Sequence, residues 1–241
     1  MPAITPFKHL KRCSQRSKLY AQLQGQLIVS VQAPDGHAMR DTHTLTHVAA
    51  ACVDGGAPAI RCGGYGGLKD IRSISNRVDV PVFGLTKEGS EGVYITPTRD
   101  SVREVAESGA TVVCADATFR PRPDGSTFAE LVTVAHDSGI LIMADCATPE
   151  EVLSAHKAGA DFVSTTLAGY TEHREKTVGP DFDCLREARE LVPDAFLIGE
   201  GRFSNPADVA HGRLIGANAI IVGTAITDPG FITGQFASLL H

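Results

Sequence analysis

Eight short apolar segments recur along the whole chain, and their spacing is the feature that most constrains its fold. They are LIVSVQ (27–32), PAIRC (58–62), VPVFGLT (80–86), TVVCAD (111–116), ILIMAD (140–145), DFVSTT (161–166), AFLIGE (195–200) and NAIIVG (218–223). Successive segments end 21 to 34 residues apart, which suits one strand followed by one helix. Each segment is continuously apolar, as parallel strands covered by helices require.

Helix boundary signals stand between these segments. TPEE (148–151) and NPAD (205–208) each begin with a capping residue, followed by proline at the first helical position and a carboxylate in the first turn. The phrases SGAT (108–111), AGAD (158–161) and IGAN (215–218) put glycine where a helix ends and a strand begins. The sequence therefore predicts an α/β fold, a single (β/α)8 TIM barrel. An open Rossmann or flavodoxin-like sheet is the alternative, and it is disfavoured because no G-x-G-x-x-G follows the first segment.

Composition limits the domain plan and the partners. We expect residues 1–16 to form a partly disordered N-terminal extension, and 17–241 to form the catalytic barrel. A net charge of −6 argues against nucleic acid or an acidic membrane surface as a partner. No run approaches the ~20 apolar residues of a membrane span, and no signal peptide is evident. The six cysteines form no C-x-x-C pair, which disfavours a zinc or redox site. We expect buried free thiols instead, which fits a reducing cytoplasm.

Polar residues stand where the predicted strands end, and in a barrel these ends meet at one mouth. They are Gln32, Arg61, Lys87, Asp116, Asp145, Thr165, Thr166, Glu200, Gly223 and Thr224. Lys87 follows a wholly apolar segment. A solvated loop lysine is the ordinary interpretation, but a partly desolvated lysine at the mouth would act as a base or form a Schiff base.

The other charged residues at the mouth have their own alternatives. Glu200 would form a salt bridge, either with a neighbouring strand or with Lys87. Arg61 is hard to bury without an anion, which favours a functional role. Asp116 and Asp145 would each either cap their own loop or bind substrate hydroxyls.

The last two strand ends carry a predicted phosphate site. Gly201 and Gly223 lie in the turns GEGR (199–202) and VGTA (222–225), and backbone N–H groups at such turns approach oxyanions. Arg202 would add charge. His43 and His47 have a spacing that suits a metal, but no acidic third ligand is evident, so we expect no metal.

The motifs in this order resemble the N-acylglucosamine-6-phosphate 2-epimerase family, also called N-acetylmannosamine-6-phosphate 2-epimerase. The resemblance runs from about Leu19 to Phe236. It rests on LIVSVQAP, YITPT, ADAT and RPRP with Phe119 between them, TTLAGYT, GEGRF before an Asn-Pro helix start, and VGTAIT.

The resemblance implies a (β/α)8 barrel that converts N-acetylmannosamine 6-phosphate to N-acetylglucosamine 6-phosphate in bacterial sialic-acid catabolism, without nucleotide, metal or other cofactor. The family's catalytic lysine and paired glutamate match Lys87 and Glu200. Its substrate-binding glutamine, arginine and aspartate match Gln32, Arg61 and Asp145. We add Thr165 to the expected substrate-binding residues, and Gly201, Arg202, Gly223 and Thr224 to the expected phosphate-binding residues.

Two departures from the family pattern stand out. Members often carry a basic residue directly after AIT in the last turn, whereas this chain has Asp228, which would repel phosphate. The CGG that follows Arg61 is also smaller than expected.

The resulting hypothesis is epimerisation by proton transfer at C2, with Lys87 as the base and Glu200 tuning it. Whether Lys87 acts alone or shares the two protons with Glu200 stays open. The alternatives are a phosphate-binding lyase or synthase with Lys87 as a Schiff base, and a non-catalytic sugar-phosphate sensor. Besides a small-molecule sugar phosphate, the expected partner is a second copy in a homodimer.

Overall fold

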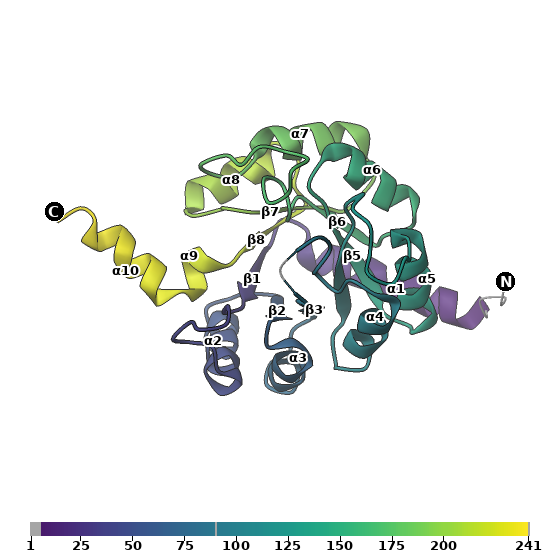
Figure 1. Cartoon of the computed structure of the whole chain (residues 1–241), viewed down its shortest axis with the longest axis horizontal. Helices are drawn as coiled ribbons and strands as arrows, with labels where there is room; N and C mark the ends of the chain where they lie inside the picture. Colours follow the sequence, from purple (N-terminus) through teal and green to yellow (C-terminus); the bar gives the residue numbers. More distant parts are fainter. Residues whose placement is uncertain (1–5, 90, 241) are drawn as a thin grey trace.

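Eight parallel strands close into a barrel in this computed structural model, which describes residues 6–89 and 91–240 (Figure 1). The strands are β1 Leu27–Val31, β2 Ile60–Gly64, β3 Val82–Thr86, β4 Val112–Asp116, β5 Leu141–Asp145, β6 Phe162–Ser164, β7 Leu197–Glu200 and β8 Ala219–Val222. Each strand pairs with the next along the chain, and β8 pairs with β1. The predicted TIM barrel is confirmed, and each apolar segment contains one strand or overlaps it.

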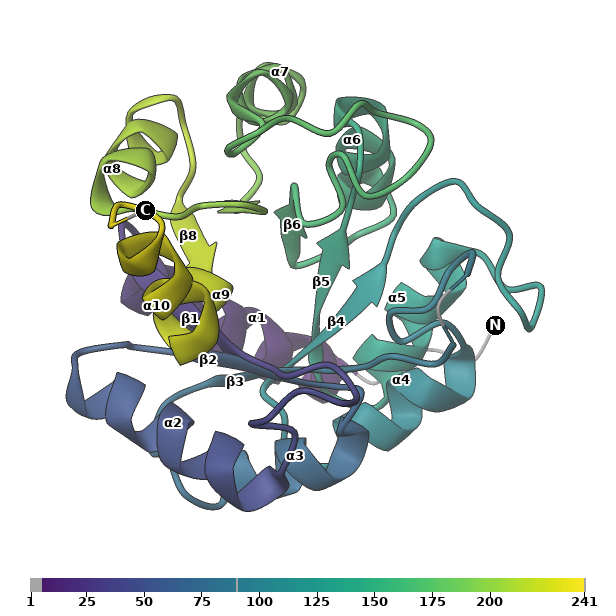
Figure 2. The ribbon, with the colours of Figure 1, turned by 60° about the vertical axis from the view of Figure 1, so that its left-hand side comes forward.

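Helices α2 to α8 lie around the strands (Figure 2). They are α2 Thr42–Asp54, α3 Gly67–Ser75, α4 Arg99–Ala106, α5 Phe128–Asp137, α6 Pro149–Lys157, α7 Phe182–Leu191 and α8 Pro206–Leu214. The predicted helix starts are confirmed, since Thr148 accepts a hydrogen bond from the backbone N–H of Glu151 and Asn205 accepts one from that of Asp208. Gly159 adopts φ +96°, which a side chain would strain.

The amino-terminal helix α1, Pro6–Leu23, packs at the end of the barrel opposite the mouth. The Tyr20 ring lies 5.2 Å from the ring of Phe162 and 4.6 Å from that of Phe196, near the starts of β6 and β7. The side chains of Arg12 and Arg16 both pair with Asp161. The boundary expected after residue 16 therefore falls inside a helix that contacts the barrel on both sides of it, and residues 1–5 of the expected extension lie outside the described residues.

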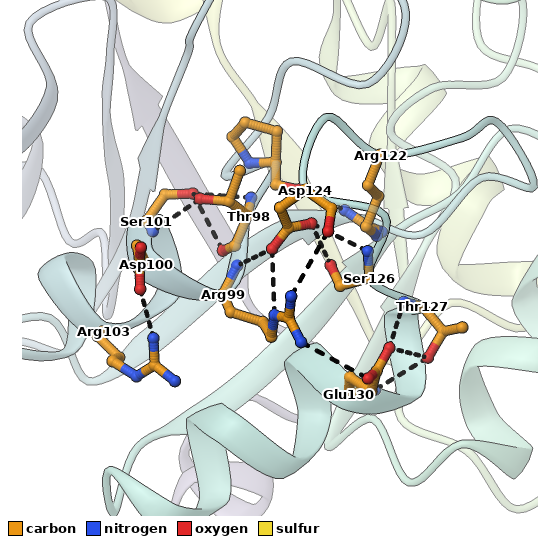
Figure 3. A network of polar contacts seen from close by, with 11 residues as sticks. Thr98, Arg99, Asp100, Ser101, Arg103, Arg122, Asp124, Ser126, Thr127 and Glu130 are labelled. Atoms are coloured by element: carbon orange, nitrogen blue, oxygen red, sulfur yellow. Dashed lines mark hydrogen bonds and ion pairs between the residues drawn. The ribbon is translucent and has the colours of Figure 1, made fainter.

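The loops that follow β3 and β4 are tied together beside the mouth, as Figure 3 shows. Asp124 accepts hydrogen bonds from the backbone N–H of Arg99 at 3.0 Å and from the Arg99 Nε at 3.2 Å. The side chain of Arg122 donates to the backbone oxygens of Pro97 and Asp116. These contacts fix the wall formed by the ends of both strands.

The chain ends in two helices, α9 Thr224–Thr227 and α10 Pro229–Ala237. Figure 1 shows α10 projecting away from the barrel, and none of its residues is buried. Phe236 has 70% of its surface exposed. Helices α2 to α8 cover the barrel, whereas α10 leaves most of its residues exposed.

Candidate active site

A cavity of about 810 Å³ opens at the carboxyl-terminal ends of the strands. Eight of the ten predicted site residues line it, namely Gln32, Arg61, Lys87, Glu200, Gly201, Arg202, Gly223 and Thr224. The other two, Asp145 and Thr165, are buried behind its wall. The topology therefore brings the eight lining residues together from five strand ends, those of β1, β2, β3, β7 and β8.

Arg61 joins two carboxyl groups at the floor of this cavity. It belongs to the interior of β2 and keeps only 2% of its surface exposed. Its Nη2 donates to Asp145 Oδ2 at 2.6 Å, and its Nη1 donates to Glu200 Oε1. A guanidinium fork suits two carboxyl groups held at fixed positions. Asp145, at the end of β5, is thus a partner of Arg61 and does not itself line the cavity.

Lys87 follows β3 on the opposite side of the ring from β7, which carries Glu200. Its backbone N–H donates to Gly64 O at 3.0 Å, and its Nζ lies 5.2 Å from the centre of the Tyr65 ring. Burial lowers the pKa of the Lys87 ammonium, and the nearby Arg61 charge lowers it further. Lys87 is therefore held closer to its neutral, basic form than an exposed lysine.

Asp145 is wholly buried, and this changes its charge state. Burial raises the pKa of the Asp145 carboxyl to about 7, and the neighbouring Glu200 acts in the same direction, while Arg61 opposes both. Two carboxyl groups that share one arginine do not both ionise easily. The group is thus poised to change protonation near neutral pH.

The two threonines after β6 have different positions. Thr165 donates its hydroxyl to the backbone oxygen of Glu200 at 3.0 Å and accepts from the Glu200 N–H at 3.2 Å, so it links β6 to β7. Thr166 lines the cavity instead, and its Oγ1 lies 2.7 Å from Asp145 Oδ1 and 2.8 Å from Glu200 Oε2. The expectation of a substrate-contacting hydroxyl at Thr165 thus fits Thr166 better.

Gln32 reaches the cavity because glycine stands next to it. A side chain at Gly64, where φ is +61°, would come within 2.5 Å of Gln32 Oε1. At Gly63 it would come within 2.0 Å of the backbone oxygen of Leu85. The small CGG segment is therefore needed to seat β2 beside β3 and to admit Gln32. Among the described residues Gln32 Oε1 is buried without a hydrogen-bond partner, which leaves it available to a substrate donor.

Arg202 already has several partners within the protein. It donates to the backbone oxygens of Gly179 and Ala168 and to the hydroxyl of Thr177, each at 2.8 Å, and its guanidinium lies over the Tyr170 ring at 5.1 Å. It therefore fixes the loop between β6 and α7 at the rim. Two of its five N–H groups and its charge remain for an anion.

Asp228 has a structural explanation. Its carboxylate accepts from the backbone N–H of Phe231 at 3.1 Å and so caps α10. Its other oxygen lies 3.4 Å from His37 Nε2 in the loop after β1. Asp228, which departs from the family pattern, thus caps the start of α10 and links this helix to the loop after β1 at the mouth.

The second aspartate at a strand end serves its own loop. Asp116 pairs with Arg120 at 2.7 Å and accepts from the Thr118 hydroxyl at 2.7 Å. The predicted alternative of a loop cap therefore fits Asp116.

Aromatic residues at the site were missed by the sequence analysis. Tyr65, Tyr94 and Tyr170 all line the cavity. Only their positions just after or between strand segments would have indicated this.

Nothing in the described ranges brings three or more His, Cys, Asp or Glu side chains together as metal ligands, and the rings of His43 and His47 simply contact each other. In the part of the chain that the structure describes, no helix has the length and apolarity needed to cross a membrane.

The fold and the site together define a class of protein, a (β/α)8 barrel enzyme with a desolvated lysine facing a buried arginine and two carboxyl groups. The family model described as "Putative N-acetylmannosamine-6-phosphate epimerase" matches residues 45–241. The chain belongs to this family of carbohydrate epimerases.

Similar proteins agree along nearly the whole chain. A protein of Corynebacterium glutamicum (strain R) is 99% identical over 95% of this chain and 98% of its own length, and one of Cutibacterium acnes is 42% identical over 93% and 97%. Both carry the name of putative N-acetylmannosamine-6-phosphate 2-epimerase. The solved N-acetylmannosamine-6-phosphate 2-epimerase of Clostridium perfringens is 35% identical, with a TM-score of 0.87, over 92% of this chain and 96% of that one.

Proposed function

We propose that this protein interconverts N-acetylmannosamine 6-phosphate and N-acetylglucosamine 6-phosphate in amino-sugar catabolism, without a cofactor. The observation that carries the proposal is the lowered pKa of Lys87 in a cavity that also contains Glu200 and Arg61. A neutral lysine is a competent base for a carbon acid. Membership of the epimerase family supports the same reaction.

The chemistry follows from the substrate. In the open-chain 2-acylamino aldose, the C1 carbonyl acidifies the hydrogen on C2. Lys87 removes this hydrogen as a proton, and the electron pair moves into the carbonyl to give a planar enolate. Return of a proton to the other face inverts C2. The donor is the Lys87 ammonium, after the enolate has turned its other face towards it, or Glu200 on the opposite wall.

The phosphate binds at the ends of β7 and β8. The supporting observations are that Gly201, Gly223 and Thr224 line the same cavity and that Arg202 brings a cation to its rim. Gln32 Oε1 remains for a hydroxyl or amide donor of the sugar. In this proposed binding mode, C2 lies between the walls that carry Lys87 and Glu200.

The experiment is an NMR assay with N-acetylmannosamine 6-phosphate in D2O. We expect formation of the 2-epimer with deuterium at C2, because a lysine ammonium exchanges its protons with water. We also expect the rate to rise with pH at a pKa below the ordinary lysine range, since Lys87 must lose its proton to act as a base. Turnover that keeps the original C2 hydrogen throughout would exclude proton transfer at this carbon.

The same assay separates the alternatives. Borohydride reduction during turnover would trap a Schiff base on Lys87 in a lyase or synthase, and we expect no adduct. A sugar-phosphate sensor would bind the compound without converting it.

We also propose a homodimer, formed through α10. The exposed Phe236 of α10, and Leu239 and Leu240 just after it, would otherwise lie in solvent. An apolar hollow of about 480 Å³ near β1 and α2 is available on the barrel. Light scattering should give twice the chain mass, and Phe236→Glu should give a monomer while Gln235→Glu does not. A monomeric unmodified protein would overturn this.

The four buried cysteines Cys62, Cys114, Cys146 and Cys184 form no disulfide, which supports a cytoplasmic location.

A further inference from the structure

Thr166 has more hydrogen-bond partners than its one proton can serve by donation. Its Oγ1 lies 2.7 Å from Asp145 Oδ1, 2.8 Å from Glu200 Oε2, and in contact with Ser164 Oγ. A hydroxyl donates one hydrogen bond and accepts two. If both carboxyl groups were ionised, both oxygens would need a proton from Thr166, and one of these contacts would be repulsive.

The position of Ser164 determines which bonds Thr166 accepts. Ser164 Oγ accepts a hydrogen bond from the backbone N–H of Thr166 at 3.1 Å, which leaves its own proton to donate to Thr166 Oγ1. Thr166 then has one proton to give and one lone pair still to fill. Three short contacts fit only if one carboxyl oxygen receives the Thr166 proton and the other carries a proton of its own.

We propose that Asp145 and Glu200 share one proton through Thr166, and that this proton supplies the acid that stabilises the enolate oxygen of the substrate. The shared proton leaves one negative charge to pair with Arg61. Asp145 is the natural resting place, because it is wholly buried, whereas Glu200 keeps 12% of its side chain exposed and lines the cavity.

The transfer balances in protons. Asp145 Oδ1–H gives its proton to Thr166 Oγ1 while the Thr166 hydroxyl gives its own to Glu200 Oε2. Asp145 becomes a carboxylate, Glu200 becomes a carboxylic acid, and Thr166 ends unchanged. The new O–H of Glu200 then rotates away from Thr166 Oγ1 towards the C1 oxygen, on which negative charge develops as Lys87 removes the C2 proton. A preorganised donor at such an oxygen typically contributes on the order of 10²–10³ in rate.

The same proton also favours a basic lysine. With both carboxyl groups ionised, two negative charges would hold Lys87 as an ammonium. With one proton shared, Arg61 balances the remaining charge, and Lys87 is left to respond to burial, which lowers its pKa. Thr166 is therefore a positioning residue, and Glu200 is the group that touches the substrate.

Infrared spectroscopy of the unmodified protein tests the shared proton directly. We expect the C=O band of a protonated carboxylic acid at neutral pH, shifted in D2O, absent in Asp145→Asn and displaced in Thr166→Val, which loses the acceptor. The absence of this band in the unmodified protein would overturn the proposal. The relay rests on the proposed epimerase function, but the measurement needs no substrate, so the two can fail separately.

Kinetics test the role of the hydroxyl. Thr166→Val keeps the shape of the side chain, and we expect it to lower kcat by about 10²-fold with little change in KM, because the donor matters only as the enolate forms. Thr166→Ser keeps the hydroxyl and should restore kcat to within roughly threefold. A loss in Thr166→Val that is confined to KM, or a Thr166→Ser variant that is equally impaired, would contradict the relay.

Discussion

Two clusters of arginine and buried carboxyl groups lie at opposite ends of the same barrel. At the mouth, the site cluster has two carboxyl groups, Asp145 and Glu200, for one buried arginine, Arg61. At the other end, the base cluster has a single carboxylate, Asp161, which is held by several donors. These are Arg12 at 3.3 Å, Arg16 at 3.7 Å, His136 at 2.9 Å and the backbone N–H of Ile142 at 3.0 Å.

The difference between the two clusters lies in the balance of donors and acceptors. Asp161 has a donor for each oxygen, so it serves to join α1 to β5 and β6. The site cluster has more acceptors than donors, and burial raises the pKa of Asp145 there. Excess donors produce a fixed structural contact, whereas excess acceptors leave a proton that can move.

The largest effect should come from Lys87→Met. We expect turnover to fall on the order of 10²–10⁴-fold, because the base is lost. Thermal stability should be unchanged or higher, because burial penalises the Lys87 charge. Lys176→Met is the matched control, since the Lys176 Nζ also lies 5.2 Å from the centre of a tyrosine ring, that of Tyr170. Near-normal turnover in Lys87→Met would remove Lys87 from the mechanism.

The base cluster should affect stability and leave the rate intact. We expect Asp161→Leu to lower the free energy of unfolding by about 1–3 kcal/mol, because it leaves the buried Ile142 N–H and the paired cations without an acceptor. Asp161→Asn keeps one acceptor oxygen and should lose less. Denaturant unfolding together with kcat measures both. An unchanged free energy of unfolding in Asp161→Leu, or a lowered kcat in either Asp161 variant, would contradict the assignment of a purely structural role to the base cluster.

A smaller effect should appear in the pH dependence of stability. The pKa of Asp145 is about 7 in the folded protein, above the value of roughly 3.9 for an unfolded chain. Its contribution to stability is therefore complete at low pH and is lost as pH rises through this window. Asp145→Asn cannot ionise, so its melting temperature relative to the unmodified protein should increase from acid to alkaline pH. A difference that is flat with pH would show that folding does not raise the pKa of Asp145.

The smallest effect is expected at Asp228, a carboxylate that belongs to neither cluster. Asp228→Ala removes the cap of α10, which is typically worth about 1 kcal/mol to a helix, whereas Asp228→Asn keeps a capping oxygen. Hydrogen exchange of the α10 amides should quicken in the first variant and change little in the second. Equally quickened exchange in both variants would show that Asp228 acts through its contact with His37 instead of through the cap.

The sequence predicted the barrel because burial of parallel strands on both faces leaves a repeated apolar pattern. It also predicted which residues meet at the mouth, since topology alone brings strand ends together. The sequence could not predict positions at which a shift of one residue decides whether a side chain faces the cavity. β6 ends at Ser164, and nothing in the sequence shows which of Thr165 and Thr166 turns towards the cavity.

Partners from distant segments were equally hidden. Arg202 is held by Ala168, Thr177 and Gly179, and Asp161 by a helix that begins far upstream, at Pro6. The charge state of Asp145 depends on complete burial, which only the assembled barrel provides.

The packing of α1 has a consequence for synthesis on the ribosome. Its Tyr20 rests on Phe162 and Phe196, so α1 has its final partners only after these much later segments have been made. β1 likewise cannot complete its strand pairing until β8 has been made. At roughly 5–20 residues per second, the nascent chain spends many seconds with its first helix and first strand unpaired. During that interval the apolar face of α1 is a natural substrate for chaperones.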